Sequence, residues 1–99
     1  MPHMYIVECS DGTLYVGSTI DLERRVAQHN SGDGAAYTRR RRPVRLLYAE
    51  EYDRVDEAFA REKQVQNWSR NKRMALIDGR LEDLPQLSKK RRSSPPAGG

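Results

Sequence analysis

The pattern of hydrophobic and polar positions predicts a β-hairpin at the start of the chain. Residues 4–6 and 15–17 lie in apolar, β-branched runs that flank the turn residues 10–12, Ser-Asp-Gly. Such runs on either side of a short polar turn are typical of two paired strands. Each strand carries one tyrosine, Tyr5 in the first and Tyr15 in the second.

The length of the hairpin loop decides on which faces the two phenols lie. A three-residue loop pairs Tyr5 with Gly17 and puts both phenols on one face, as diagonal neighbours roughly 7–8 Å apart at the backbone. A two-residue loop at 11–12 would shift the register by one and send Tyr5 and Tyr15 to opposite faces. We expect the three-residue loop because it leaves an apolar set together on the other face. This set is Ile6, Leu14 and Val16.

A first helix and a third strand follow the hairpin. Asp21 is the expected N-cap of the helix and Gly32 follows its end. Four residues share one face of this helix: Leu22, Arg25, Val26 and His29. Residues 31–42 are expected to form a loop rich in glycine and then in arginine. The third strand is expected over residues 44–52, with Leu46, Tyr48 and Tyr52 on one side and Leu47 and Ala49 on the other.

Two more helices are expected before the end of the folded part. Asp53 can cap a helix that reaches about Trp68, and Ser69 begins a short helix through Ile77. The apolar stripe of the longer helix consists of Val55, Ala58, Phe59 and Val65. Three leucines could then fold back on the body: Leu81, Leu84 and Leu87.

Length and composition fit one small domain with a polar tail. The chain has 99 residues, of which 36% are hydrophobic and 32% charged. We expect a single domain over residues 1–87 and a disordered tail over residues 88–99, which are basic and rich in proline and glycine. No run approaches the ~18 apolar residues of a membrane span. We therefore expect a cytoplasmic protein with no membrane partner, and expect the lone Cys9 to be a buried strand residue.

Basic residues concentrate in one segment. The net charge of +4 equals the contribution of residues 89–92, but five of the seven residues 39–45 are arginine. Such a run, with an aromatic residue before it, is a candidate loop for binding a nucleic-acid backbone. The candidate residues are Tyr37, Arg39, Arg40, Arg41 and Arg42. A solvated charge run without a ligand is the alternative.

Glu62 is an anomaly because it lies within the apolar stripe of its expected helix. A buried carboxylate without a partner costs several kcal/mol. Either Glu62 lies at the edge of the stripe or pairs with an arginine from another element, or it binds a metal ion. Magnesium often takes only one or two protein carboxylates when its other ligands are water and substrate phosphate.

Four further residues could carry chemistry. Tyr5 and Tyr15 are ordinary strand residues taken singly, and a phenol acts as a base only beside a cation that favours phenolate. Arg25 is either solvated or a phosphate clamp. His29 either complements the dipole at the end of its helix or acts as an acid, base or phosphate donor.

Together these residues resemble the GIY-YIG nuclease family. The pattern is a tyrosine closing one strand motif, a Tyr-x-Gly motif, then an arginine, a histidine or tyrosine one turn later, and a downstream glutamate. In this chain these are Tyr5, Tyr15-Val16-Gly17, Arg25, His29 and Glu62. The segments SDGTLYVGSTIDLERRVAQHNSG, YTRRRRPVRLLY and REKQVQNWSR are similar to the small, single-domain bacterial branch, and the resemblance covers residues 4–78. Ser18 stands where the repair-enzyme branch has a lysine.

The resemblance implies an α+β fold with a small three-stranded antiparallel sheet flanked by helices. It also implies an endonuclease that cleaves a phosphodiester with one Mg²⁺ or Mn²⁺ ion held by Glu62. In that mechanism Tyr5 activates water and Tyr15 orients the site. Arg25 binds the phosphate, and His29 donates to it or shuttles the proton.

Two functions follow from these observations. The first is a metal-dependent endonuclease that acts on DNA, with RNA also possible. The second is a nucleic-acid-binding module with weak or no catalysis, acting on structured DNA or RNA or within a repair complex.

Overall fold

The computed structural model describes residues 1–79, and the chain divides after Asn67 into two units that are described separately. The elements of the first unit are β1 (His3–Glu8), β2 (Leu14–Thr19), α1 (Leu22–Ser31), α2 (Ala36–Arg39), β3 (Arg45–Glu51) and α3 (Val55–Gln66). In the second unit the described residues include α4 (Arg70–Ile77). The three strands form one antiparallel sheet, which confirms the predicted fold class.

The hairpin has the register of the three-residue loop. Tyr5 pairs with Gly17, and the Cys9 amide donates to the Thr13 carbonyl over 2.8 Å. Residues 10–12 therefore form the loop, and the two-residue alternative is wrong. Because side chains alternate along a strand, this register puts both tyrosines on one face of the sheet.

β3 pairs with β1, so the strand order is β2-β1-β3 and β2 is an edge strand. The strand ends lie within one residue of the predicted ends, but the predicted alternation is wrong. The register shifts between Ile6 and Val7, so that Tyr48 pairs with Ile6 and Leu46 with Val7. Leu47 is thus the extra residue of a bulge, and Leu46 and Tyr48 pair with residues on opposite faces of β1.

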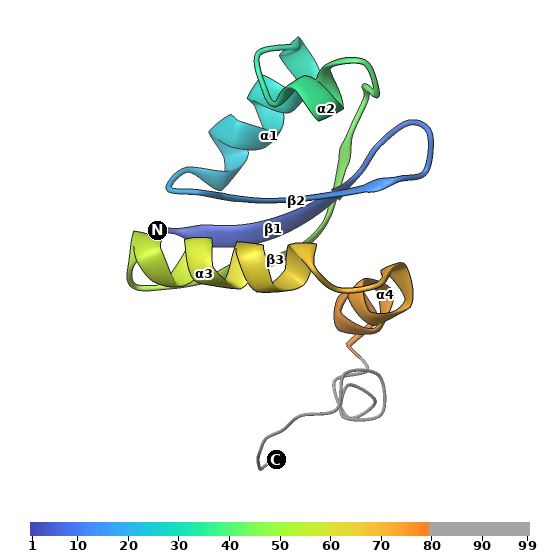
Figure 1. Ribbon diagram of the computed structural model, residues 1–99. Helices are drawn as coiled ribbons and strands as arrows, with labels where there is room; N and C mark the ends of the chain where they lie inside the picture. Colours follow the sequence, from blue (N-terminus) through green and yellow to red (C-terminus); the bar gives the residue numbers. More distant parts are fainter. Residues whose placement is uncertain (80–99) are drawn as a thin grey trace. The chain divides into compact units, whose positions relative to one another are not determined.

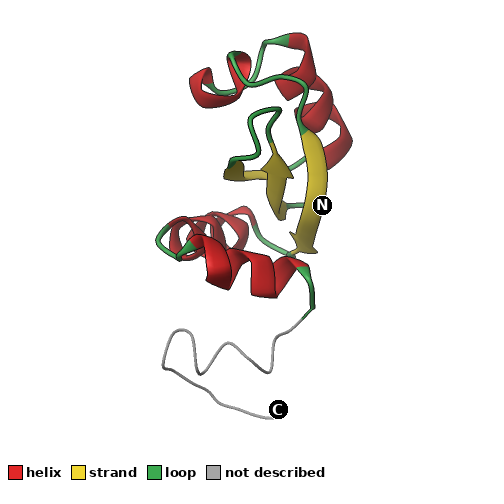
Figure 2. Cartoon of the chain, turned by 90° about the vertical axis from the view of Figure 1, so that its right-hand side faces the viewer, coloured by secondary structure: helices red, strands yellow, loops and turns green. Residues whose placement is uncertain are grey.

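Helices cover both faces of this sheet, as Figure 1 and Figure 2 show. α1 and α2 lie on one face, and α3 packs against β1 and β2 on the other. The first face carries a buried cluster of Tyr5, Val7, Cys9 and Val44. The second face carries the buried side chains of Met4, Ile6, Leu14 and Val16, which includes the expected apolar set. The central strand is covered from both sides, and its residues 4–7 are at most 1% exposed.

α1 begins and ends where the sequence predicts. The Asp21 carboxylate accepts from the Arg24 amide, and Gly32 follows the helix with a φ of 93°. The next segment differs from the prediction because it contains the short helix α2. Within it, the amide and the hydroxyl of Thr38 both donate to the Ala35 carbonyl. A helix of four residues is too short to show a hydrophobic period.

α3 differs from the prediction at its start and in its buried side. Its N-cap is Arg54 rather than Asp53. Val55 and Phe59 are 60% and 51% exposed, so the predicted stripe is wrong at these two positions. The less exposed positions of the helix, spaced by about one turn, are Ala58, Arg61, Glu62 and Val65. Long polar side chains are accommodated here because the sheet supplies their partners.

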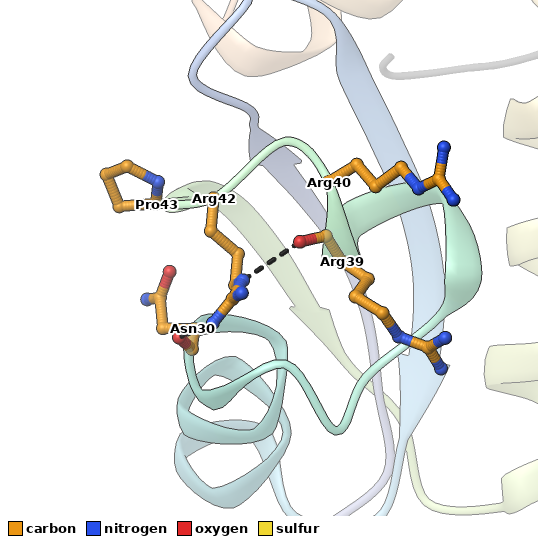
Figure 3. A pocket seen from close by; sticks show the side chains of 5 residues that line it. All are labelled: Asn30, Arg39, Arg40, Arg42 and Pro43. Atoms are coloured by element: carbon orange, nitrogen blue, oxygen red, sulfur yellow. Dashed lines mark hydrogen bonds between the residues drawn. The ribbon is translucent and has the colours of Figure 1, made fainter.

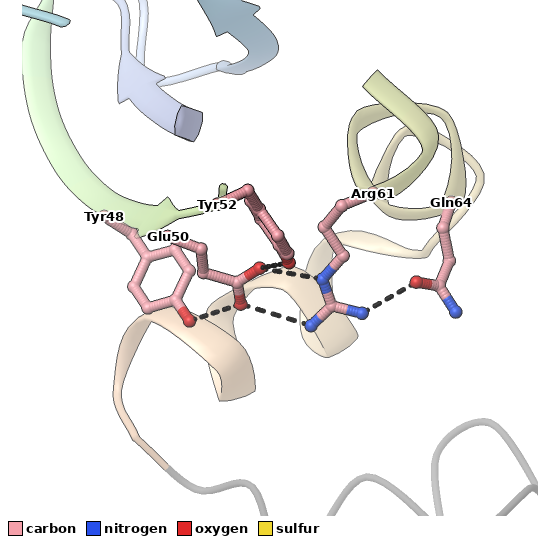
Figure 4. A network of polar contacts seen from close by, with 5 residues as sticks. All are labelled: Tyr48, Glu50, Tyr52, Arg61 and Gln64. Carbon is pink, nitrogen blue, oxygen red and sulfur yellow. Dashed lines mark hydrogen bonds and ion pairs between the residues drawn. The ribbon is translucent and has the colours of Figure 1, made fainter. Parts of the chain in front are cut away.

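Arg61 joins α3 to β3 through Glu50 (Figure 4). The Arg61 Nε and Nη2 atoms lie 2.9 and 3.2 Å from the two carboxylate oxygens. The hydroxyls of Tyr48 and Tyr52 each donate to the same carboxylate over 2.6 Å. Burial raises the pKa of Glu50, but the hydrogen bonds from Arg61 and the two phenols outweigh burial and hold this pKa below its ordinary value. The charged pair fixes α3 on the sheet and so helps to place Glu62.

α4, in the second unit, lies where the sequence predicts the last helix. The Ser69 hydroxyl accepts from the Lys72 amide at the start of α4. Asp78 is the C-cap, and Gly79 follows with a φ of 76°. The Lys72 ammonium lies 4.3 Å from the centre of the Trp68 ring.

Several predictions concern residues beyond this range. The three leucines at positions 81, 84 and 87 and the tail over residues 88–99 lie outside the described residues. The single domain over residues 1–87 therefore stays a prediction. Among residues 1–79, no helix has the length and apolar character needed to cross a bilayer.

We expect Arg61→Ala to lower the free energy of unfolding by about 2–3 kcal/mol. The substitution leaves the Glu50 carboxylate, whose side chain is 19% exposed, without its charged partner. Urea denaturation followed by circular dichroism measures the change.

Arg54→Ala is the matched control on the same helix. Its ion pair with Asp56 is exposed on both sides, at 70% and 69%, so we expect a change within about 0.5 kcal/mol. Equal losses in the two variants would contradict the anchoring role of Arg61.

Candidate active site

Tyr5 and Tyr15 project from the sheet toward His29 of α1. Their ring centres lie 5.8 and 5.3 Å from the imidazole centre, in edge-on arrangements. The Tyr5 ring lies against the backbone of Gly17, where a Cβ atom would stand 2.5 Å from the phenol oxygen. Such a distance is too short for real atoms, so the glycine of the Tyr-Val-Gly motif is required by the position of Tyr5.

His29 is fully buried, and both of its ring nitrogens are hydrogen-bonded. Nε2 lies 2.7 Å from the Tyr5 hydroxyl and Nδ1 lies 2.7 Å from Oγ1 of Thr38. Burial and the positive charge of Arg25 lower the pKa of His29 to about 4. A pKa this low favours the neutral imidazole near pH 7 and so argues against the interpretation in which His29 complements the helix dipole as a cation. Because His29 has no exposed surface, it acts on a substrate only through other groups.

Arg25 lies one turn before His29, half-buried beside both phenols. Burial raises the pKa of Tyr5 to about 12, although a hydrogen bond from Arg25 and the charge of Arg25 lower it. Burial also raises the pKa of Tyr15, again against the charge of Arg25. Both phenols are thus protonated at neutral pH. They differ in access, because Tyr5 is 1% exposed whereas Tyr15 is only partly buried.

Glu62 lies on the other side of the edge strand, on the face that α3 covers. Its Oε1 accepts from the Ser18 hydroxyl over 2.5 Å, and its Oε2 accepts from the Gln66 amide over 2.8 Å. Lys63 is 3.8 Å away. Among residues 1–79, Glu62 is therefore not paired with an arginine from another element. Its negative charge contributes to the raised pKa of both Tyr5 and Tyr15, so the carboxylate belongs to the same electrostatic environment.

The residues around Glu62 fit a cation held by one carboxylate. The Glu62 side chain is 12% exposed, and its only charged neighbour in the described part of the chain is Lys63, which is 55% exposed. Residues 1–79 contain no group of three or more histidine, cysteine, aspartate or glutamate side chains that could enclose a metal. A site of this kind suits an ion that keeps several waters and takes substrate phosphate as a ligand.

Tyr37 of α2 stacks on Tyr15, with ring centres 5.9 Å apart and planes 23° apart. The Arg41 guanidinium lies 3.9 Å from the centre of the Tyr37 ring. Arg41 also forms an ion pair of 3.1 Å with Asp11 in the hairpin loop, and its carbonyl accepts from the Ser10 amide. The hairpin loop thus holds this segment beside Tyr15.

The four consecutive arginines divide into two pairs. Arg41 is bound to the hairpin loop, and Arg42 donates to the carbonyls of Arg39 and Asn30. The side chains of Arg39 and Arg40 make no hydrogen bond or ion pair with any described residue, and Figure 3 shows them extending away from Arg42. An open hollow of about 650 Å³ in this region is lined by Asn30, Arg39, Arg40, Arg42 and Pro43. The fold therefore uses two of the arginines and leaves two available to a ligand.

Two polar residues contact the candidate site without a role assigned from the sequence: Ser18 binds Glu62, and Thr38 binds His29. Ser18 was noted only as the residue directly after the Tyr-Val-Gly motif. Thr38 carries no such signal, because a single threonine in a polar segment is ordinary turn chemistry.

The described part of the chain is thus a small α+β domain with two phenols on one face of its sheet and a carboxylate on the helix that covers the other face. The family description "GIY-YIG catalytic domain" matches residues 1–75. The chain belongs to the GIY-YIG family, which is a family of nucleases.

Relatives of similar size occur in archaea and bacteria. A UPF0213 protein of Halobacterium salinarum is 53% identical over 77 residues, which cover 78% of this chain and 100% of the relative. A UPF0213 protein of Staphylococcus saprophyticus is 48% identical, covering 76% of this chain and 92% of the relative. The solution NMR structure of a UPF0213 protein from Bacillus halodurans is 39% identical with a TM-score of 0.52, covering 91% of this chain and 100% of that one. The predicted family and fold are confirmed.

We expect the free energy of unfolding to fall as the pH is lowered from 6.5 toward 5. The pKa of His29 is about 4 in the folded protein against 6.5 ordinarily, so in this window the unfolded chain binds a proton that the folded protein excludes. The loss approaches about 1.4 kcal/mol per pH unit below the unfolded pKa. Urea denaturation at several pH values measures it.

His29→Gln provides the comparison, since glutamine does not titrate. The variant is expected to be less stable but to show a flatter dependence on pH between 6.5 and 5. An identical slope in the two proteins would show that His29 is not the titrating group.

Proposed function

We propose that the protein is a metal-dependent endonuclease that hydrolyses phosphodiester bonds in nucleic acid, with DNA as the favoured substrate. The observation that carries the proposal is that Tyr5 and Tyr15 share the face of the sheet that α1, with Arg25, covers (Figure 1). This face adjoins the edge strand on which Ser18 binds Glu62. Membership in the GIY-YIG family supports the same reaction class.

Glu62 would hold the ion, which is Mg²⁺ or Mn²⁺ in this proposal. When bound, such an ion neutralises charge on the scissile phosphate and the leaving oxygen. Ser18 and Gln66 orient the carboxylate by donating one hydrogen bond to each oxygen. Each oxygen keeps a lone pair for a cation, because a carboxylate offers about four acceptor positions.

The two phenols differ in burial. The proposal therefore exchanges the roles that the resemblance implied for them. Tyr15 is the more accessible phenol, so we assign the contact with the attacking water to Tyr15. Arg25 favours the phenolate form of Tyr15, because its charge opposes the effect of burial on this pKa. Tyr5 is 1% exposed, so we assign it a supporting role, with its hydroxyl bound to His29.

Arg25 is placed to bind the scissile phosphate. Its guanidinium carries five N–H donors in a planar fork, of which one group donates to Gln28 over 3.2 Å. The remaining donors can stabilise negative charge that develops on the phosphate oxygens during attack. One guanidinium thus links the phenols to the substrate.

Arg39 and Arg40 would bind the nucleic-acid backbone. Their side chains are exposed and have no acidic partner among residues 1–79, and Tyr37 beside them is 38% exposed. Contacts of this kind read phosphate rather than base sequence. We therefore propose that the protein recognises backbone and shape more than sequence.

A nicking assay with supercoiled and branched DNA in magnesium tests the catalytic assignment. We expect Glu62→Gln and Tyr15→Phe each to lower the cleavage rate by about 100-fold or more. Arg54→Ala, which changes an exposed pair on α3, is expected to cleave at the native rate.

Two results would overturn the assignment. Native rates in both active-site variants would show that these residues do not catalyse. Tight binding by the native protein, without cleavage of any DNA or RNA substrate in Mg²⁺ or Mn²⁺, would establish a binding module instead.

A salt titration of DNA binding tests the two arginines. We expect the double variant Arg39→Ala, Arg40→Ala to reduce the slope of log K against log salt by up to about 2, which corresponds to two lost phosphate contacts. Arg45→Ala is the control, because the Arg45 guanidinium is bound to Glu8 over 2.8 Å. The same slope in all three proteins would place the nucleic acid on another surface.

A further inference from the structure

A buried chain of hydrogen bonds leads from Tyr5 away from the candidate active site. It passes from the Tyr5 hydroxyl to Nε2 of His29 over 2.7 Å, and from Nδ1 of His29 to Oγ1 of Thr38 over 2.7 Å. The Thr38 hydroxyl then donates to the Ala35 carbonyl over 3.0 Å. His29 and Thr38 are 0% exposed, and Tyr5 is 1% exposed.

The hydrogen atoms in this chain have one arrangement that satisfies every group. If Nδ1 of His29 carries the proton, Nδ1 donates to Thr38, Thr38 donates to Ala35, and the Tyr5 hydroxyl donates to Nε2. If Nε2 carried the proton, the Tyr5 hydroxyl would lack an acceptor, since His29 is its one hydrogen-bond partner among the residues that the structure describes. A buried hydroxyl without an acceptor costs about 1–3 kcal/mol.

We propose that Thr38 is a positioning residue of the active site, because its hydroxyl fixes His29 in the tautomer with the proton on Nδ1. In this tautomer Nε2 accepts the Tyr5 hydrogen, which fixes the direction of the phenol O–H bond. In the other tautomer Nε2–H would donate to the Tyr5 oxygen, and the phenol hydrogen would have to turn elsewhere. Thr38 thus controls, through His29, how the Tyr5 hydroxyl is oriented at the candidate site. The effect on cleavage rests on the proposed function.

The backbone before α2 is also shaped around the imidazole. A Cβ atom at Gly34 would lie 2.5 Å from Nδ1 of His29 and 2.9 Å from its Cα. Only glycine therefore allows this segment to pass close enough for Thr38 to reach the ring. The segment that the sequence predicted as a plain loop is packed against a group of the active site.

Nitrogen-15 NMR of the imidazole in the full chain tests the tautomer directly. The native protein is expected to show a protonated Nδ1 and a bare Nε2 for His29. Thr38→Val removes the acceptor but keeps the shape, so a population with protonated Nε2 is expected to appear. Thr38→Ser keeps the hydroxyl, so this variant is expected to show the same spectrum as the native protein.

The proposal is overturned if the native protein shows a protonated Nε2, or if Thr38→Val keeps the native tautomer. Should Thr38→Val fail to fold, the native and Thr38→Ser spectra still decide, because a protonated Nε2 in either one contradicts the proposal. These readouts do not depend on nuclease activity. A native protein that never cleaves would therefore refute the proposed function without touching the tautomer result.

The cleavage rate at saturating DNA tests the positioning role. Thr38→Val is expected to lower this rate by about 10- to 100-fold, the usual effect of losing an outer hydrogen-bond partner. DNA affinity should stay at the native value, and Thr38→Ser should restore the rate. A changed tautomer with native cleavage would show that Thr38 orients the ring without serving the reaction, and would overturn the proposal.

Discussion

The close packing of Tyr5 between Gly17 and His29 is the constraint on which the candidate site depends. The phenol lies where any side chain at Gly17 would stand, and its hydroxyl binds the imidazole over 2.7 Å. The contact joins the central strand to its edge neighbour and to α1. Since Arg25 lies one helical turn before His29, the position of α1 also brings its guanidinium to the phenols.

Local rules were sufficient for much of the fold. The hairpin register followed from turn chemistry combined with an apolar face, and the ends of α1 followed from its caps, Asp21 and Gly32. The failures arose where tertiary contacts override local patterns. A bulge at Leu47 broke the alternation of β3. On α3, two long polar side chains occupy half-buried positions because Ser18 and Glu50 on the sheet provide hydrogen bonds.

The same distinction applies to the site. Spacing alone predicted that Tyr5 and Tyr15 share a face and that Arg25 and His29 are neighbours on one helix. Spacing could not predict that His29 is neutral, because that depends on complete burial and on the charge of Arg25. Nor could it predict that Arg41 and Arg42 serve the fold while Arg39 and Arg40 do not, since an uninterrupted run contains no information about which side chains find partners.

The topology explains why small residues occupy the end of the edge strand. The phenols and Arg25 lie on one face of the sheet, whereas Glu62 lies on a helix that covers the other face. No further strand lies beside β2 in the described part of the chain, so under the proposed function the two groups would meet one phosphate around this edge. Gly17 adds no side chain at this edge, and the Ser18 hydroxyl donates a hydrogen bond to the Glu62 carboxylate. A larger residue at Gly17 would displace Tyr5, and a lysine at Ser18 would replace a neutral donor to Glu62 with a charged competitor for any cation. Under the proposed function, small residues at these two positions fit a site that is assembled from both faces of one sheet.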